Sequence, residues 1–80
     1  MSIRVLFFGA TASITGTRQI ELPFSDDTAA ASALFDKVTA IYPELLKHKL
    51  LMSINQQYAV NDQAICDGDE VAVFTAVSGG

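Results

Sequence analysis

Apolar and polar residues alternate near both ends of the chain, in two segments that we expect to form strands. Residues 3–8 and 70–77 are rich in β-branched and aromatic side chains, which favour extended structure. Successive side chains of a strand point to opposite faces. In each segment one set of alternate residues should face a helix, and the other set, which includes Phe8 and Phe74, should face away. Because these segments are the most continuously apolar, we predict that they are central strands.

The middle of the chain has the spacing of an amphipathic helix. Oxygen-bearing side chains at residues 25–28 can accept free backbone N–H groups, so this segment predicts the helix start. Pro43 disfavours helical geometry in the residue before it, so the helix should end near Tyr42, and a short second turn should follow through residues 44–46. The buried stripe of the helix is predicted from apolar residues at intervals of three and four: Ala31, Leu34, Phe35, Val38, Ile41 and Tyr42.

The remaining segments predict shorter elements. They are strands over residues 17–22, 51–54 and 58–60, turns at 55–57, 61–62 and 67–69, and a connection with one helical turn over 10–16. The resulting order is strand, strand, helix, strand, short strand, strand, which is an α+β arrangement. We therefore predict a β-grasp fold, with a mixed four- to five-stranded sheet packed on one main helix.

Length and charge narrow the range of functions. Eighty residues and 8.6 kDa fit one domain over residues 1–80, with residues 75–80 as a flexible C-terminal tail. No apolar run reaches the roughly 18 residues of a membrane span, so we expect no membrane partner. The single cysteine fits a reducing compartment, so we expect a cytoplasmic location. Five Lys and Arg against nine Asp and Glu give a net charge of −4, which disfavours a nucleic-acid partner. An acidic chain suits a basic partner surface.

Residues that could support catalysis are few. Cys66 is the only cysteine and His48 the only histidine, so neither a disulfide nor a zinc site is expected. We expect Cys66 to be a small buried residue rather than a nucleophile, and His48 to be solvated. Asp67, Asp69 and Glu70 match no calcium loop, so a polar turn is favoured over a cation site. The chain alone is therefore predicted to be a carrier or binding module with no metal and no stably bound cofactor.

The C-terminus has the most informative chemistry. Gly79 and Gly80 have no side chains, so the end of the chain can enter a narrow active site where a Cβ would clash. The terminal carboxylate would then be the reacting group. ATP can convert it to an acyl-adenylate, and a sulfur donor can displace AMP to leave a thiocarboxylate. A cloning scar is the alternative explanation of two terminal glycines.

Four segments, in order, resemble the small subunit of molybdopterin synthase over essentially the whole chain. They are residues 5–9 (VLFFG), 54–56 (INQ), 67–71 (DGDEV) and 77–80 (VSGG), and residues 12–16 resemble that family's first connection. The resemblance implies a ubiquitin-like sulfur carrier that a ubiquitin-activating-type enzyme adenylates at Gly80 with ATP. A sulfur donor protein would then form the thiocarboxylate. Inserted into the large synthase subunit of a heterotetramer, the carrier would donate sulfur to cyclic pyranopterin monophosphate.

The resemblance also implies where partners bind. Hydrophobic residues at the matching positions contact both the large subunit and the activating enzyme, which assigns partner binding to Phe8, Tyr58, Phe74 and Val77. Scattered exposed apolar groups are the plainer interpretation. The family often has two prolines where this chain has Thr75-Ala76, and their absence leaves the tail freer.

Other functions share the expected fold. A thiamine-pathway sulfur carrier has the same Gly-Gly end, and a ubiquitin-like modifier would be conjugated to lysines. The chain could also be a non-covalent β-grasp interaction domain, in which Gly79 and Gly80 are incidental.

Overall fold

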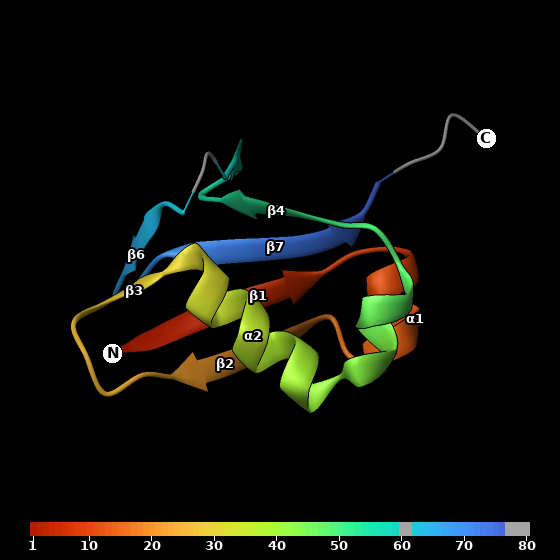
Figure 1. Ribbon diagram of the computed structural model, residues 1–80, viewed down its shortest axis with the longest axis horizontal. Helices are drawn as coiled ribbons and strands as arrows, with labels where there is room; N and C mark the ends of the chain where they lie inside the picture. The colour runs from red at the N-terminus through yellow and green to blue at the C-terminus, as the bar shows by residue number, and fades with distance from the viewer. Residues whose placement is uncertain (60–61, 77–80) are drawn as a thin grey trace.

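A mixed five-stranded sheet forms the centre of the computed structural model, which describes residues 1–59 and 62–76 (Figure 1). The elements in chain order are β1 (Ser2–Phe7), α1 (Ala10–Thr15), β2 (Gln19–Pro23), β3 (Thr28–Ala30), α2 (Ala31–Ile41), the 3-10 helix η1 (Pro43–Lys47), β4 (Leu50–Ile54), β5 (Gln57–Tyr58), β6 (Ala64–Cys66) and β7 (Glu70–Thr75). A second sheet consists of β3 and β6.

The two ends of the chain meet in the middle of the large sheet. Its strand order is β2-β1-β7-β4-β5, with β1 parallel to β7 and every other pair antiparallel. In the β1–β7 register, Val5 is opposite Val71 and Phe7 opposite Val73. The predicted mixed sheet and the predicted central position of the two most apolar strands are confirmed.

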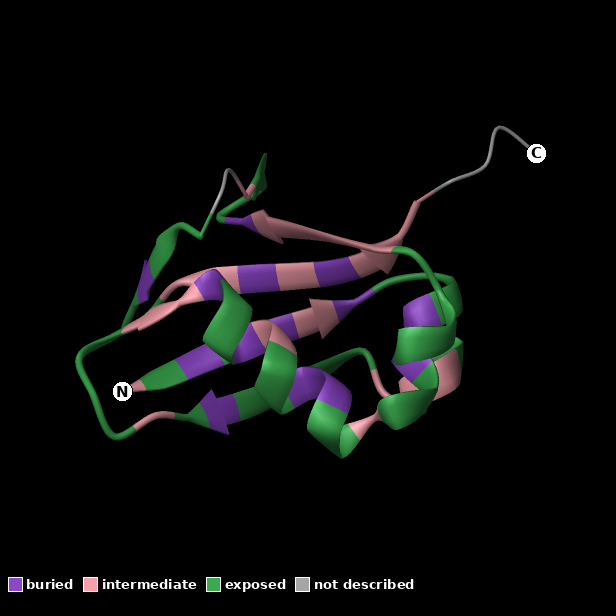
Figure 2. Ribbon diagram, viewed as in Figure 1, coloured by how far each residue is buried: buried purple, intermediate pink, exposed green. Residues whose placement is uncertain are grey.

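Helix α2 covers one face of this sheet, as Figure 1 shows. Alternate residues of β1 and β7 are buried against it, which gives the banded pattern of Figure 2. The hydrophobic core consists of Ile3, Val5, Phe7, Leu22, Ala31, Leu34, Val38, Leu45, Ile54, Ile65, Val71 and Val73. Within the described residues, no helix is both long enough and apolar enough to cross a membrane.

The short helix α1 occupies the predicted connection at the end of β1. Gly9, before it, has a φ of +55°, and Gly16, after it, has a φ of +75° in the left-handed region. Residues with a Cβ rarely adopt such angles, so the two glycines allow the chain to turn sharply into and out of this helix. Helix α1 thereby reverses the chain between the adjacent antiparallel strands β1 and β2.

The predicted start of the main helix is wrong. Residues 28–30 form β3, which pairs with β6, a strand that the sequence pattern did not predict. Helix α2 begins only at Ala31, and its free N–H groups are satisfied from a distant segment. The backbone N–H and hydroxyl of Ser32 donate to the two carboxylate oxygens of Asp62 at 2.8 and 3.0 Å. A cap from Asp62 replaces the predicted cap from residues 25–28.

Two burial predictions are also wrong. Cys66 is exposed, because Ile65 occupies the inward position of β6 and its neighbour therefore points outward. Ile41 is 52% exposed, because the buried face of α2 is turned toward Val38 and Thr39, which leaves Ile41 at its margin. His48 is exposed, as predicted.

The hairpin between β4 and β5 is tighter than predicted. Its turn consists of Asn55 and Gln56, with φ of +51° and +70°, and residue 57 already belongs to β5. This pair of positive angles is typical of a two-residue hairpin turn. Of the predicted short strand over 58–60 and turn at 61–62, residues 60 and 61 lie outside the described part of the chain.

Replacing Asp62 by alanine should lower the free energy of unfolding by about 1 kcal/mol, because two donors at the start of α2 lose their acceptor. Chemical denaturation followed by circular dichroism measures this change. The matched control is Asp26→Ala, which should change stability by less than about 0.5 kcal/mol, since this exposed residue precedes the helix without capping it. Equal losses in both variants would contradict the assignment of the cap.

Candidate partner-docking site

The face of the large sheet opposite α2 is divided into an apolar half and a charged half. The apolar half contains five side chains, which we call the apolar patch: Leu6, Phe8, Leu51, Tyr58 and Phe74. Strand pairing brings them together, because Leu51 is opposite Phe74 and Tyr58 extends the same face from β5. Phe8 is 54% exposed and Tyr58 68% exposed. A contiguous group of this size is typical of an interaction surface.

Phe74 is half-buried, whereas Phe8 is exposed as the alternation predicts. The rings of Tyr58 and Phe74 have centroids 6.0 Å apart and are tilted by 50°. Aromatic pairs at this separation stabilise each other beyond the area they bury. The outer surface of Phe74 is therefore partly covered by Tyr58, and the two rings form one raised aromatic unit.

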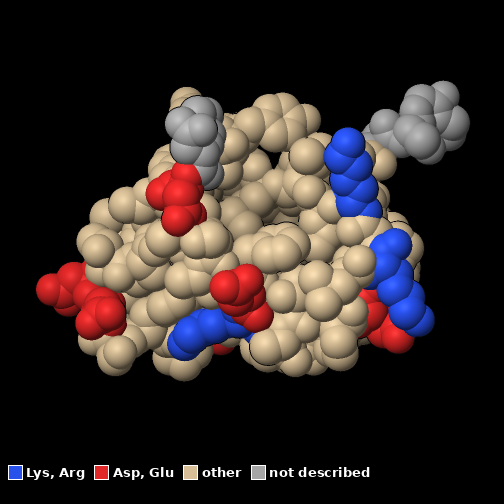
Figure 3. Space-filling model, viewed as in Figure 1, with Lys and Arg blue, Asp and Glu red and all other residues tan. Residues whose placement is uncertain are grey.

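The charged half lies where β1 and β7 begin. Arg4 is between two acids, 3.8 Å from Glu21 and 3.9 Å from Glu70, and all three side chains are at least one-third exposed. Exposed pairs of this kind contribute up to about 1 kcal/mol. On the opposite, helix-covered face, acidic and basic side chains are interspersed (Figure 3). Because β1 and β7 are parallel, they begin at the charged half and end at the apolar patch.

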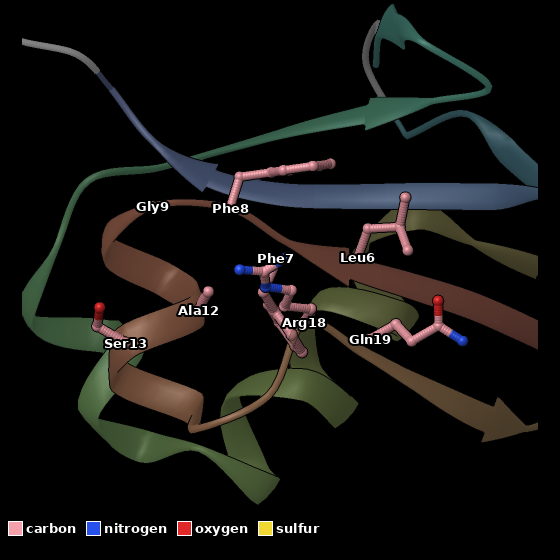
Figure 4. A pocket seen from close by; sticks show the side chains of 8 residues that line it. All are labelled: Leu6, Phe7, Phe8, Gly9, Ala12, Ser13, Arg18 and Gln19. Atoms are coloured by element: carbon pink, nitrogen blue, oxygen red, sulfur yellow. The ribbon is translucent and has the colours of Figure 1, made fainter.

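Phe8 lines two hollows of about 460 Å³ each. The first lies between the end of β1, helix α1 and the start of β2, with Leu6, Ala12, Arg18 and Gln19 among its walls (Figure 4). The second is lined by Phe8, Gly9, Ala10, Phe74 and Thr75. Since Thr75 is the last residue of β7, this second hollow adjoins the point where the chain leaves the sheet.

A buried threonine fixes this end of the sheet. The hydroxyl of Thr11 accepts a hydrogen bond from the backbone N–H of Phe8 at 3.0 Å and donates one to the carbonyl of Val73 at 2.7 Å. Thr11 is fully buried, and so is its hydrogen bond to Val73, whereas its hydrogen bond with Phe8 is partly buried. The threonine therefore joins the backbone at Phe8 to the residue that precedes Phe74, and sets the spacing of the two aromatic residues.

The structure brings three predicted site residues together and does not describe three others. Phe8, Tyr58 and Phe74 lie in one patch, whereas residues 77, 79 and 80, which include the predicted reacting group Gly80, are outside the described part of the chain. Alternation along the strands could have added Leu6 and Leu51 to the predicted site. No sequence signal distinguishes Thr11, because its importance comes from contacts made across 62 positions of the chain.

The titratable side chains considered from the sequence do not come together in the described part of the chain. Among the described residues, no group of three or more His, Cys, Asp or Glu side chains is arranged to hold a metal ion. The exposed thiol of Cys66 is on β6, and His48 follows η1, so the two are on separate elements. What this geometry can do is bind a protein beside the end of β7.

Comparison with known proteins identifies the family. Residues 5–80 match the ThiS family, so the match reaches the terminal glycine. The chain belongs to the ThiS family. Among its curated relatives, this ThiS-family chain is 37% identical to the molybdopterin synthase sulfur carrier subunit of Haemophilus influenzae, over 98% of this chain and 99% of the relative.

Solved structures show the same ubiquitin-like β-grasp fold. The small archaeal modifier protein SAMP1 from Haloferax volcanii superposes on this ThiS-family chain with a TM-score of 0.85 and 24% identity, over the whole of both chains. A second solved structure is the complex of subunits 1 and 2 of the molybdopterin-converting factor from Helicobacter pylori. One chain of that complex superposes with a TM-score of 0.69 and 18% identity, again over the whole of both chains.

Replacing Thr11 by valine should lower the free energy of unfolding by about 1–3 kcal/mol, because the N–H of Phe8 and the carbonyl of Val73 would lose their buried partner. Valine has nearly the same shape, so packing changes little. Urea denaturation of the variant measures the loss, and Thr28→Val, at an exposed strand position, is the control. A loss no larger than that of the control would show that the hydroxyl does not tie this end of the sheet together.

Proposed function

We propose that this chain is the sulfur-carrier subunit of a molybdopterin synthase. The observation that carries the proposal is its 37% identity, along its whole length, to a molybdopterin synthase sulfur carrier subunit. The family match that extends to Gly80 supports the same reaction at the same terminal group.

The chemistry resides in the carboxylate of Gly80. A carboxylate oxygen attacks the α-phosphorus of ATP on an activating enzyme, pyrophosphate leaves, and an acyl-adenylate forms. Sulfur from a donor protein, at the oxidation level of sulfide, then attacks the acyl carbon, and AMP leaves. In the large synthase subunit the sulfur of this thiocarboxylate displaces an oxygen substituent from a carbon of cyclic pyranopterin monophosphate. Water then cleaves the acyl–sulfur bond, which leaves the sulfur on the pterin and regenerates the carboxylate of Gly80. The adjacent Gly79 keeps the end of the chain narrow enough to reach that site.

The apolar patch serves as the docking surface in this proposal. The H. pylori complex contains two subunits of a molybdopterin-converting factor, which supports a larger subunit as the partner here. Phe8 and Phe74 of the patch line a hollow together with Thr75, the last residue of β7, so a protein bound there lies next to the start of the residues that lead to Gly80. The ubiquitin-activating-type enzyme would use the same surface at a different time, because both enzymes must reach the same terminus.

A protein modifier is the second candidate, favoured by the fold that the chain shares with a small archaeal modifier protein. Intact mass spectrometry separates the two functions. After incubation with ATP, the activating enzyme and a sulfur donor, a carrier gains about 16 Da by exchange of one oxygen for sulfur. A modifier instead forms conjugates through lysine amines of other proteins. Unchanged mass and no conjugates would leave a non-covalent interaction domain.

Deleting Gly80 should abolish the gain of about 16 Da and the formation of molybdopterin in a reconstituted assay, because the required terminal carboxylate is displaced. Affinity for the large subunit should stay within about threefold of wild type, since the anchoring residues are on the sheet. Replacing Gly79 by tryptophan should block the reaction in the same way. Molybdopterin formation by the chain that lacks Gly80 would mean that another group carries the sulfur, and the exposed Cys66 would be the first to test.

Replacing Phe74 by alanine should weaken binding of the large subunit by about 1–3 kcal/mol, as for an aromatic residue at the centre of an interface. Phe8→Ala should have an effect of the same kind. Isothermal titration calorimetry measures both, and thermal unfolding checks that each variant is folded. The control is Leu46→Ala, which removes an exposed apolar side chain from η1, away from the patch. Wild-type affinity in both phenylalanine variants would remove the patch from the proposed function.

A further inference from the structure

Arg18 lies in the same hollow as Phe8. The hollow has apolar walls from Leu6, Phe8 and Ala12, and polar groups only from Arg18 and its neighbours Ser13 and Gln19. Arg18 is exposed, and its carbonyl accepts a hydrogen bond from the backbone N–H of Phe7 at 2.9 Å, so the residue lies beside the end of β1 (Figure 4). A partner side chain that packs against this side of Phe8 therefore also covers the positive charge.

The charge of Arg18 is not compensated within the described part of the chain. Among those residues, the ion pairs involve Arg4 with two acids where β1 and β7 begin, and Lys47 with Glu44. The other residues around the hollow are neutral. On a chain with a net charge of −4, the edge of the apolar patch is thus locally positive.

Covering an unpaired guanidinium costs free energy, because it loses water without gaining an acceptor. A partner that docks on Phe8 must offset this cost at Arg18. The planar fork of N–H donors in arginine matches the two oxygens of a carboxylate, so an aspartate or glutamate of the partner is the best acceptor.

Resting on the proposed function, we propose that Arg18 is the polar anchor of the docking surface and binds a carboxylate side chain of the protein that docks on the apolar patch. The pairing fixes the orientation of the partner, because the charge is at one edge of the patch only. It also means that the surface at Arg18 favours an acidic side chain of the partner, although the net negative charge of the chain favours a partner that is basic elsewhere.

Binding of the purified large synthase subunit to charge variants tests the proposal. Arg18→Gln should raise the dissociation constant about tenfold or more and make binding less dependent on salt, and Arg18→Glu should raise it further. Arg18→Lys should keep part of the affinity, since it retains the charge without the fork. The matched control is Arg4→Gln in the charged half of the open face, where the change should stay below about threefold.

The outcomes distinguish this inference from the function on which it rests. Wild-type affinity of Arg18→Glu, together with weakened binding of Phe8→Ala, would overturn the carboxylate pairing and leave the docking patch intact. An equal effect of Arg4→Gln and Arg18→Gln would also overturn it, because only overall charge would matter. The gain of about 16 Da with ATP and a sulfur donor tests the carrier function independently of either arginine.

Discussion

The parallel pairing of β1 with β7 determines both the core and the docking surface. It joins residues as distant as Val5 and Val71, and its register places Phe7 against the helix and Phe8 on the open face. Because side chains alternate along a strand, a shift of one residue would exchange the two faces completely. The apolar patch therefore depends on the same register that builds the core, and a shift of that register would disrupt both.

Parallel strands also end at the same edge of the sheet, and this explains why the features of the candidate docking site lie close together at that edge. The apolar patch, the buried hydroxyl of Thr11 and the guanidinium of Arg18 all lie near the ends of β1 and β7, whereas Arg4 and its two acids lie where these strands begin. A face with one apolar end and one charged end binds a complementary surface best in one orientation. For the proposed carrier, that orientation presents the end of β7 to the partner.

Much of this arrangement follows from local pattern, and the exceptions have a common cause. The alternation of apolar and polar residues predicts the strands. It also places Phe8 and Phe74 on the sheet face that points away from the helix, because successive side chains of a strand alternate between the two faces whatever its partner strand. The start of α2 was not predictable from residues 25–28, since β6 pairs with residues 28–30 and Asp62 caps the helix from 30 positions away. The exposure of Cys66 depends on that same unforeseen pairing. Arg18 was not predictable because its environment is a hollow between three elements.

The free-energy cost of fixing the C-terminal residues explains why the proposed docking surface has several anchors. The residues after Thr75 number five and span about 17 Å when extended, so a carrier docked at the patch can reach a site that distance away. Fixing the backbone of a residue that is free in solution costs about 1–2 kcal/mol, so several such residues outweigh one aromatic anchor, which contributes about 1–3 kcal/mol. A proline after the aromatic residue would reduce this cost by restricting the free chain, and this sequence has Thr75-Ala76 instead. The aromatic side chains and the charge of Arg18 must therefore act together, along with enclosure of the glycines by the partner, for the terminus to be held in place.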